Sequence, residues 1–142
     1  MGTGTQPAES PSPALIFEVL MAHQRSAALR AAIELDLFRA IGKGLGDVAS
    51  LAQRCSASER GIRILCDYLT IIGLLAKVNG RYLHTPASAL FLDPRSPACI
   101  ASTARFLGNP ALHEPYQHLA DIVRNGRTVL PGEGTVEPEN PI

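Results

Sequence analysis

The 142-residue sequence has few aromatic residues and no net charge, and each shortage limits what the protein can be. It contains no Trp, four Phe and three Tyr, whereas Ala and Leu are abundant. This composition favours helices whose small side chains let neighbouring helices approach closely. Lys plus Arg number 13 and Asp plus Glu also number 13. A neutral chain does not attract a polyanion, which argues against a general nucleic-acid role.

Cysteine and long apolar runs are also scarce. Cys55, Cys66 and Cys99 are an odd number of cysteines without a Cys-x-x-Cys pair, which indicates reduced thiols in a cytoplasmic protein. No apolar run approaches the roughly 20 residues of a membrane-spanning helix, and the N-terminus lacks the layout of a signal peptide. We therefore predict a soluble, cytoplasmic protein with no membrane partner.

The composition divides the chain into three parts. Residues 1–12, rich in Gly, Thr, Ser and Pro, are predicted to form a disordered tail. Residues 13–126 carry helical patterns and are long enough for one domain. Residues 127–142 hold three Pro and two Gly and are predicted to be a linker toward a further structural element.

The first helical pattern starts at Ser12-Pro13, with Ser as N-cap, and runs to about Gly42. We expect a break near residues 23–26 to divide it. The segment has two apolar stripes, more than a single small domain can cover, which predicts packing against a second copy of the chain. The alternative is that the excess apolar surface is internal core.

The next patterns are typical of a winged helix. Asp47 is expected to cap a short helix, and Ser56 and Glu59 have the spacing of a capping box. The following helix has apolar residues at helical spacing: Ile62, Leu65, Cys66, Leu69 and Ile72. Residues 74–78 and 81–84 then flank Asn79-Gly80, a strong hairpin signal. The sequence predicts a mainly α, winged-helix-like fold with a small two-stranded β-hairpin wing.

Three helix starts follow the predicted wing. Ser96-Pro97 is expected to open a helix that runs to about Leu107, and Asn109-Pro110 a short segment. Glu114-Pro115 is expected to start a last helix that ends at Asn125-Gly126.

Two motifs that could bind a ligand have simpler interpretations. The segment Gly42-Lys43-Gly44-Leu45-Gly46 has the spacing of a nucleotide-binding loop, but the residues before it are helical rather than a strand, so we interpret it as a plain turn. The four histidines form no His-x-x-x-His pair: His23, His84, His113 and His118. We expect no catalytic, cofactor-binding or metal-binding residue in this chain.

DNA binding by a transcriptional regulator is the alternative function that a winged helix raises. A DNA-reading helix needs polar and basic residues on its exposed face. Here the helix after Glu59 combines two basic residues with a second apolar stripe: Arg60 and Arg63, and Ile64, Tyr68 and Ile71. The wing adds only Lys77 and Arg81. A helix that is apolar on two sides is better suited to packing.

The chain contains three segments, residues 33–38, 61–75 and 113–126, that together resemble the caffeate- and hydroxyneurosporene-type O-methyltransferases. Residues 33–38 (IELDLF) are similar to an early helix of that family, and residues 61–75 (GIRILCDYLTIIGLL) to its second winged-helix helix. Residues 113–126 (HEPYQHLADIVRNG) are similar to the segment before its catalytic domain, with Tyr116 where Trp is usual. The resemblance covers about residues 13–142.

The resemblance implies that the chain is the N-terminal dimerisation domain of an enzyme that uses S-adenosylmethionine (SAM) to methylate a hydroxyl of a small acceptor, aromatic or polyketide. In that family the domain forms an intertwined homodimer. SAM and the catalytic histidine belong to a separate Rossmann-like domain, so this chain alone is expected to bind no cofactor and to be inactive.

The resemblance also implies three residues of the substrate pocket. Met21 falls where a residue of the first helix reaches into the partner's pocket, whereas Phe106 and Leu107 fall where two residues line the subunit's own pocket. A thioether adapts its shape to a ligand, and a Phe ring suits an aromatic acceptor. The alternative for each residue is ordinary core packing.

Overall fold

The computed structural model describes residues 10–127. Most of the predicted tail and linker, residues 1–9 and 128–142, lies outside the described residues. The elements in chain order are α1 (Ala14–Glu34), α2 (Leu37–Gly42), α3 (Val48–Arg54), α4 (Glu59–Ile71), β1 (Leu75–Val78), β2 (Arg81–His84), α5 (Pro86–Phe91), α6 (Ala101–Leu107), α7 (Pro110–Gln117) and α8 (Leu119–Asn125). The mainly α fold with a two-stranded hairpin is as predicted.

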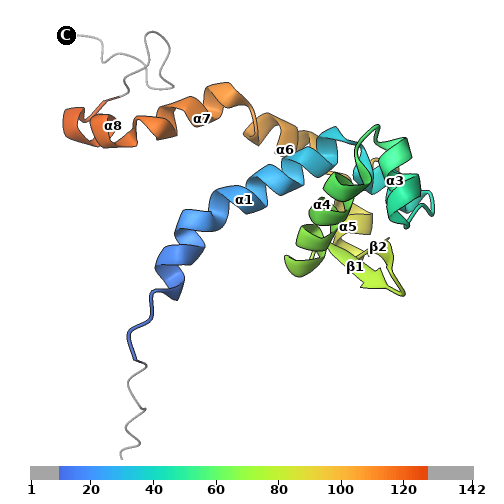
Figure 1. The fold of residues 1–142 in the computed structure, drawn as a ribbon. Coiled ribbons are helices and arrows are strands. Elements are labelled where there is room, and N and C mark those ends of the chain that lie inside the picture. The colour runs from blue at the N-terminus through green and yellow to red at the C-terminus, as the bar shows by residue number, and fades with distance from the viewer. Residues whose placement is uncertain (1–9, 128–142) are drawn as a thin grey trace, which may run out of the picture.

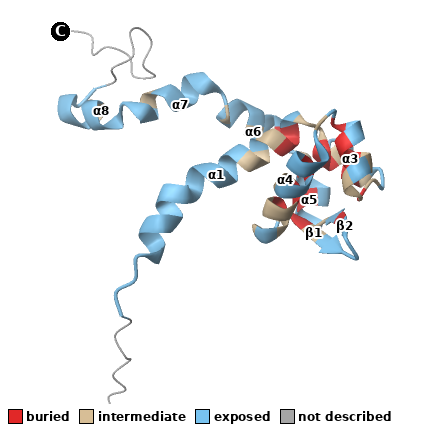
Figure 2. Ribbon diagram, in the orientation of Figure 1, coloured by how far each residue is buried: buried red, intermediate tan, exposed pale blue. Residues whose placement is uncertain are grey.

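The molecule consists of a packed body and two arms (Figure 1). The body, residues 28–101, contains the end of α1, the elements from α2 to α5 and the loop that leads to α6. The first arm, residues 14–27, is the rest of α1, and the second arm, residues 102–125, is most of α6 with α7 and α8. All buried residues belong to the body, and the arms are exposed almost throughout (Figure 2).

Helix α1 corrects two predictions. It continues through residues 23–26 without a break, because this stretch contains neither Gly nor Pro. It ends at Glu34 rather than near Gly42, because Asp36 adopts a left-handed conformation with a φ of 57° and turns the chain into α2. The Asp36 carboxylate lies 3.0 Å from Arg39 Nε and 3.4 Å from an Arg54 nitrogen, so this corner is held by α2 and α3.

The caps of the two central helices follow from short polar side chains. Asp47 caps α3 as predicted, because its carboxylate accepts a hydrogen bond of 2.8 Å from the backbone N–H of Ser50. That bond lowers the pKa of Asp47. The predicted capping box of α4 was wrong: Ser58 is the N-cap and accepts from Gly61 N–H, whereas Ser56 has a φ of 50° in the preceding turn.

The hairpin is confirmed. Strands β1 and β2 are antiparallel, and Asn79 and Gly80 both have positive φ, as the tight turn between them requires. Tyr82 on β2 is fully buried, and its hydroxyl donates a hydrogen bond of 2.6 Å to Asp67 of α4. The wing is therefore fixed against α4.

The region after the wing differs from the prediction. Helix α5 was missed, although Thr85 and Ser88 form a capping box and Pro86 occupies the first turn. Ser96-Pro97 does not open a helix: it lies in a series of turns, and α6 begins only at Ala101. Asn109-Pro110 starts a short segment as predicted, the helix α7, and the Asn109 side chain caps it. The prediction that Glu114-Pro115 starts the last helix was wrong, because Pro115 lies inside α7 and α8 begins at Leu119. Helix α8 ends at Asn125 as predicted, with Gly126 in a left-handed conformation.

Candidate functional site

Each of the two arms carries many exposed apolar side chains. On α1 these are Leu15, Ile16, Phe17, Val19, Leu20 and Met21. On the second arm they are Phe106, Leu107, Leu112, Tyr116, Leu119 and Val123. Soluble monomers rarely expose large contiguous apolar patches, which usually mark interaction surfaces. The arms are therefore the candidate functional surface.

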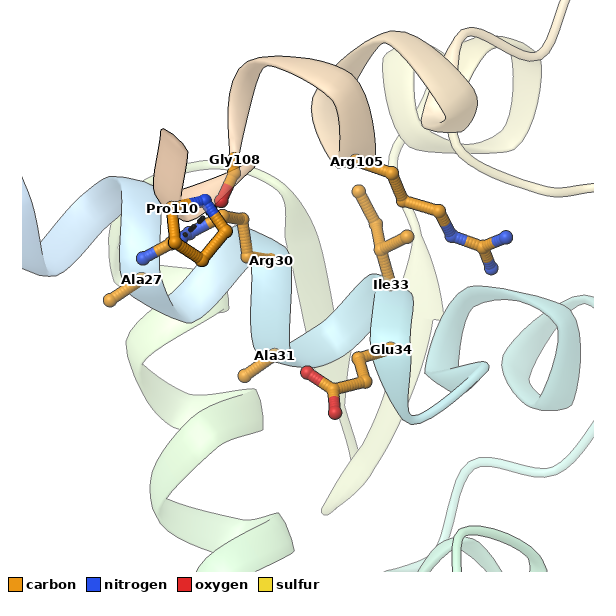
Figure 3. Close-up of a pocket in the computed structure, with 8 residues that line it drawn as sticks. All are labelled: Ala27, Arg30, Ala31, Ile33, Glu34, Arg105, Gly108 and Pro110. Carbon is orange, nitrogen blue, oxygen red and sulfur yellow. Dashed lines mark hydrogen bonds between the residues drawn. The ribbon is translucent and has the colours of Figure 1, made fainter. Parts of the chain in front are cut away.

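A groove of about 660 Å³ lies where the two arms diverge from the body. Its lining residues come from α1 and from the corner between α6 and α7: Ala27, Arg30, Ala31, Ile33, Glu34, Arg105, Gly108 and Pro110 (Figure 3). The floor is apolar, and charged side chains stand on both sides. Its volume is in the range of small-molecule sites, but it opens directly onto the apolar faces of the arms.

The three sequence-predicted pocket residues lie on these arms. Met21 is 47% exposed on α1, and Phe106 and Leu107 are 66% and 59% exposed at the end of α6. None of the three lines the groove. None of the three belongs to the buried core of the single chain, and their role in a pocket stays a prediction.

The candidate DNA-reading helix α4 exposes apolar side chains beside Arg60 and Arg63, and the wing cations are bound within the chain. The outer face of α4 exposes Ile64 and Ile71, the latter to 82%. The wing cations are bound within the chain: Lys77 Nζ lies 2.7 Å from the Asp67 carboxylate, and Arg81 donates to the Gly44 carbonyl at 3.1 Å. The hydrogen bond to Lys77 lowers the pKa of Asp67. These contacts leave few free donors for base edges.

The glycine-rich segment is a turn, as interpreted from the sequence. It follows helix α2 and not a strand, and Gly44 has a φ of 92°. A Cβ on Gly46 would lie 2.9 Å from the Tyr82 carbonyl, so glycine is needed here for close packing against the wing. Residues 10–127 contain one sheet, of two antiparallel strands, and so provide no strand–loop–helix unit that could hold SAM.

The histidines have local partners. His84 bonds to the Ser88 hydroxyl and to the Phe38 carbonyl, both at 2.9 Å, and its Nε2 lies 3.8 Å from Asp93. Sequence reasoning missed this set of Ser, His and Asp, which joins α2 to α5. Ser88 is fully buried and bonded to its own helix cap, so its hydroxyl is closed to a substrate. No group of three metal-binding side chains occurs in residues 10–127.

Two further features of the body are the ion pair between Arg95 and Asp93 and the cysteines. Arg95 donates to the Asp93 carboxylate at 2.7 Å and to the Gly42 carbonyl, and this bonding lowers the pKa of Asp93. Cys55 and Cys66 are buried, and burial raises the pKa of Cys66 to about 12. Cys99, in the loop before α6, is partly accessible.

No helix in the described part of the chain is long and apolar enough to span a membrane.

An exposed pair of apolar arms on a winged-helix body defines a class of association domain, and comparison with known proteins identifies the family. The O-methyltransferase dimerisation domain matches residues 17–94, more than half of the chain. The chain therefore belongs to the O-methyltransferase dimerisation-domain family. This result confirms the resemblance drawn from the sequence.

Individual relatives agree with this assignment. The tetracenomycin polyketide synthesis 8-O-methyl transferase of Streptomyces glaucescens is 34% identical over 124 residues, which cover 86% of this chain and 36% of that protein. A crystal structure of a Nostoc punctiforme protein assigned to the O-methyltransferases is 45% identical with a TM-score of 0.84, covering 92% of this chain and 39% of the other.

A third relative is the human N-acetylserotonin methyltransferase in complex with SAM. It is 29% identical with a TM-score of 0.72, and the match covers 89% of this chain and 37% of the other. The chain thus spans little more than a third of the length of these relatives.

Proposed function

We propose that this chain is the dimerisation and pocket-forming part of a SAM-dependent small-molecule O-methyltransferase. The family assignment supports the dimerisation role, and the relative solved with SAM supports SAM as the methyl donor of the full enzyme. The chain matches little more than a third of each relative, so we assign SAM binding and the chemistry to the part of such an enzyme that this chain does not match. The chain alone would then be inactive.

The observation that carries this proposal is the apolar surface of the arms. A helix that is apolar on several sides is a buried helix, yet no residue of α1 before Ala32 is buried in the single chain. A second copy is the occupant that the family supports. A dimer through both arms would bury on the order of 2,000 Å² or more, the range of stable homodimers.

The acceptor would bind beside the arms. We propose that Met21 of one copy reaches toward Phe106 and Leu107 of the other, so that two chains form one pocket wall. The side chains are apolar and one is aromatic, which suits a planar acceptor. The polyketide and N-acetylserotonin enzymes among the relatives support an aromatic or polyketide hydroxyl as the methylated group. The three unpaired cysteines support a cytoplasmic location.

Sedimentation equilibrium of the 142-residue chain tests the dimer. Wild type is expected to be a dimer at micromolar concentration, and Leu20→Asp to be a monomer, because it would place a charge in an apolar contact. Ser26→Asp is the control, since it adds the same charge at an exposed polar position on another side of α1. A monomeric wild type, or a Leu20→Asp dimer of unchanged affinity, would contradict the proposal.

A further inference from the structure

The corner between α6 and α7 is bonded by side chains from two other places in the chain. The Arg30 guanidinium on α1 donates a hydrogen bond of 2.9 Å to the carbonyl of Gly108. The His113 ring on α7 bonds through Nε2 to the carbonyl of Leu107 at 2.7 Å, and because a carbonyl only accepts, this nitrogen carries the proton. Two consecutive carbonyls at the end of α6 thus have donors from α1 and from α7.

These carbonyls are groups that a helix leaves without internal partners. The last four carbonyls of an α-helix have no N–H of their own helix to bind, and cationic donors near them are favourable. Arg30 supplies such a donor across 78 positions of sequence. Arg30 lies in the part of α1 that belongs to the body, three residues after the first arm ends, so the bond joins α1 to the base of the second arm (Figure 3).

Gly108 is required at this corner by the position of Arg30. Its φ of −82° is open to any residue, so backbone conformation does not demand glycine. A Cβ at this position would instead overlap the Cδ of Arg30. The contact therefore depends on both residues: Arg30 provides a long cationic side chain, and Gly108 has no Cβ that would overlap it.

The first arm continues helix α1 and α6 packs on α1, but the rest of the second arm has little else to set its direction. No residue of α7 or α8 is buried, and helices of eight and seven residues are marginal in water by themselves. In a twofold dimer the same surface occurs on both copies, so an error in the angle between the arms would enter the interface twice. The fit of the two copies therefore depends on the angle between the arms in each copy.

We propose that Arg30 and Gly108 form a clasp that holds the two arms at the opening into which a second copy fits, and that both act as positioning residues for dimerisation. This inference rests on the proposed homodimer. Arg105 lines the same groove without bonding to Gly108, and so provides a matched control.

Sedimentation equilibrium and thermal unfolding of the 142-residue chain test the clasp. Arg30→Ala and Gly108→Ala are each expected to raise the dimer dissociation constant about tenfold or more, whereas Arg105→Ala leaves it within about twofold. Arg30→Lys, which keeps a donor, is expected to restore most of the affinity. The Tm of the body, followed in monomeric samples, is expected to stay unchanged in all four variants.

The double variant gives the sharpest result. Once Arg30 is truncated, the Cδ and Cγ atoms that a Cβ at position 108 would overlap are gone, and the backbone carbonyl of Ala104, 3.0 Å from that Cβ, is the close contact that remains. Gly108→Ala is therefore expected to add much less loss in the Arg30→Ala background than it causes alone. Additive losses, an Arg105→Ala effect equal to that of Arg30→Ala, or a wild-type affinity in Arg30→Ala would each overturn the clasp while leaving the homodimer intact. A wild-type chain that stays monomeric would instead overturn the homodimer itself.

Discussion

The body and the arms are built from similar residues but are stabilised in different ways. The body encloses side chains such as Phe38, Leu51 and Leu69 completely and joins its elements by internal polar contacts. The arms carry equally apolar side chains that face solvent in the single chain. Apolar content alone therefore does not make a core: the body encloses a core of its own, whereas the arms enclose none in the single chain and, in the proposed dimer, would be covered by a second copy.

The largest expected difference between the two regions concerns paired Phe substitutions. Phe38 is 1% exposed and stacks on His84, so Phe38→Ala is expected to lower the free energy of unfolding by about 3–5 kcal/mol. Phe106→Ala on the second arm is expected to change it by less than about 0.5 kcal/mol in the monomer. Urea unfolding followed by circular dichroism measures both, and similar losses would show that the division into body and arms is wrong.

Two Asp substitutions sharpen the comparison at low pH. Hydrogen bonds from Arg95 lower the pKa of Asp93, so its carboxylate stabilises the fold above its ordinary pKa of about 4, and this contribution is lost as the pH falls through the lowered value. Asp93→Asn is expected to cost about 1.5–3 kcal/mol at pH 7. It should also weaken the acid dependence of body unfolding between pH 5 and 2.

The control for that experiment lies on the second arm. Asp121 pairs with Arg124 at 2.6 Å within α8, where both are exposed. Asp121→Asn is expected to leave body unfolding unchanged at every pH, because exposed pairs contribute little. Equal acid dependence in wild type and Asp93→Asn would contradict the role given to Asp93.

Two glycines with positive φ, one in the body and one at the end of the second arm, compare the cost of backbone strain in the two regions. Gly80 in the wing and Gly126 after α8 have φ of 76° and 66°, and neither has an atom within 4 Å of a built Cβ. An alanine at either position is strained by about 1 kcal/mol through its backbone alone. Gly80→Ala is expected to lower body stability by that amount in thermal unfolding, and Gly126→Ala to leave it unaltered. An effect of Gly126→Ala would show that α8 contributes to body stability.

The smallest expected effect on the body comes from dilution. Short helices without buried residues lose helicity when uncovered, so the circular dichroism signal at 222 nm is expected to fall as the dimer dissociates, with the body Tm in the monomer retained. Leu20→Asp at high concentration is expected to match diluted wild type. A signal that is independent of concentration across the dissociation range would mean that the arms are helical without a partner.

Much of the body could be predicted from the sequence because its signals are local. Asp47 as a cap, the spacing from Ile62 to Leu69, and Asn79-Gly80 each act within a few residues, and all three are confirmed. Helix α5 was missed because six residues are too few to show a helical period. The corner at Asp36 was missed because one of its partners, Arg54, is 18 residues away.

The candidate site was less predictable because its contacts join residues that are far apart in the sequence. The bond from Arg30 to Gly108 spans 78 residues, and no local pattern predicts it. Met21, Phe106 and Leu107 were proposed through resemblance to a family, and their role in a pocket stays a prediction. In the proposed dimer a second chain would cover the arms. The sequence of one chain indicates such a partner only through its excess of apolar residues.

The cysteines have a practical consequence for following the arms in solution. A thiol reacts as its thiolate, and burial with a pKa of about 12 keeps Cys66 protonated at neutral pH. Cys55 is also buried, whereas Cys99 is partly accessible two residues before the first buried residue of α6, Ala101. Maleimide dyes should therefore label the native protein at one place, at the root of the second arm, without any engineered attachment point.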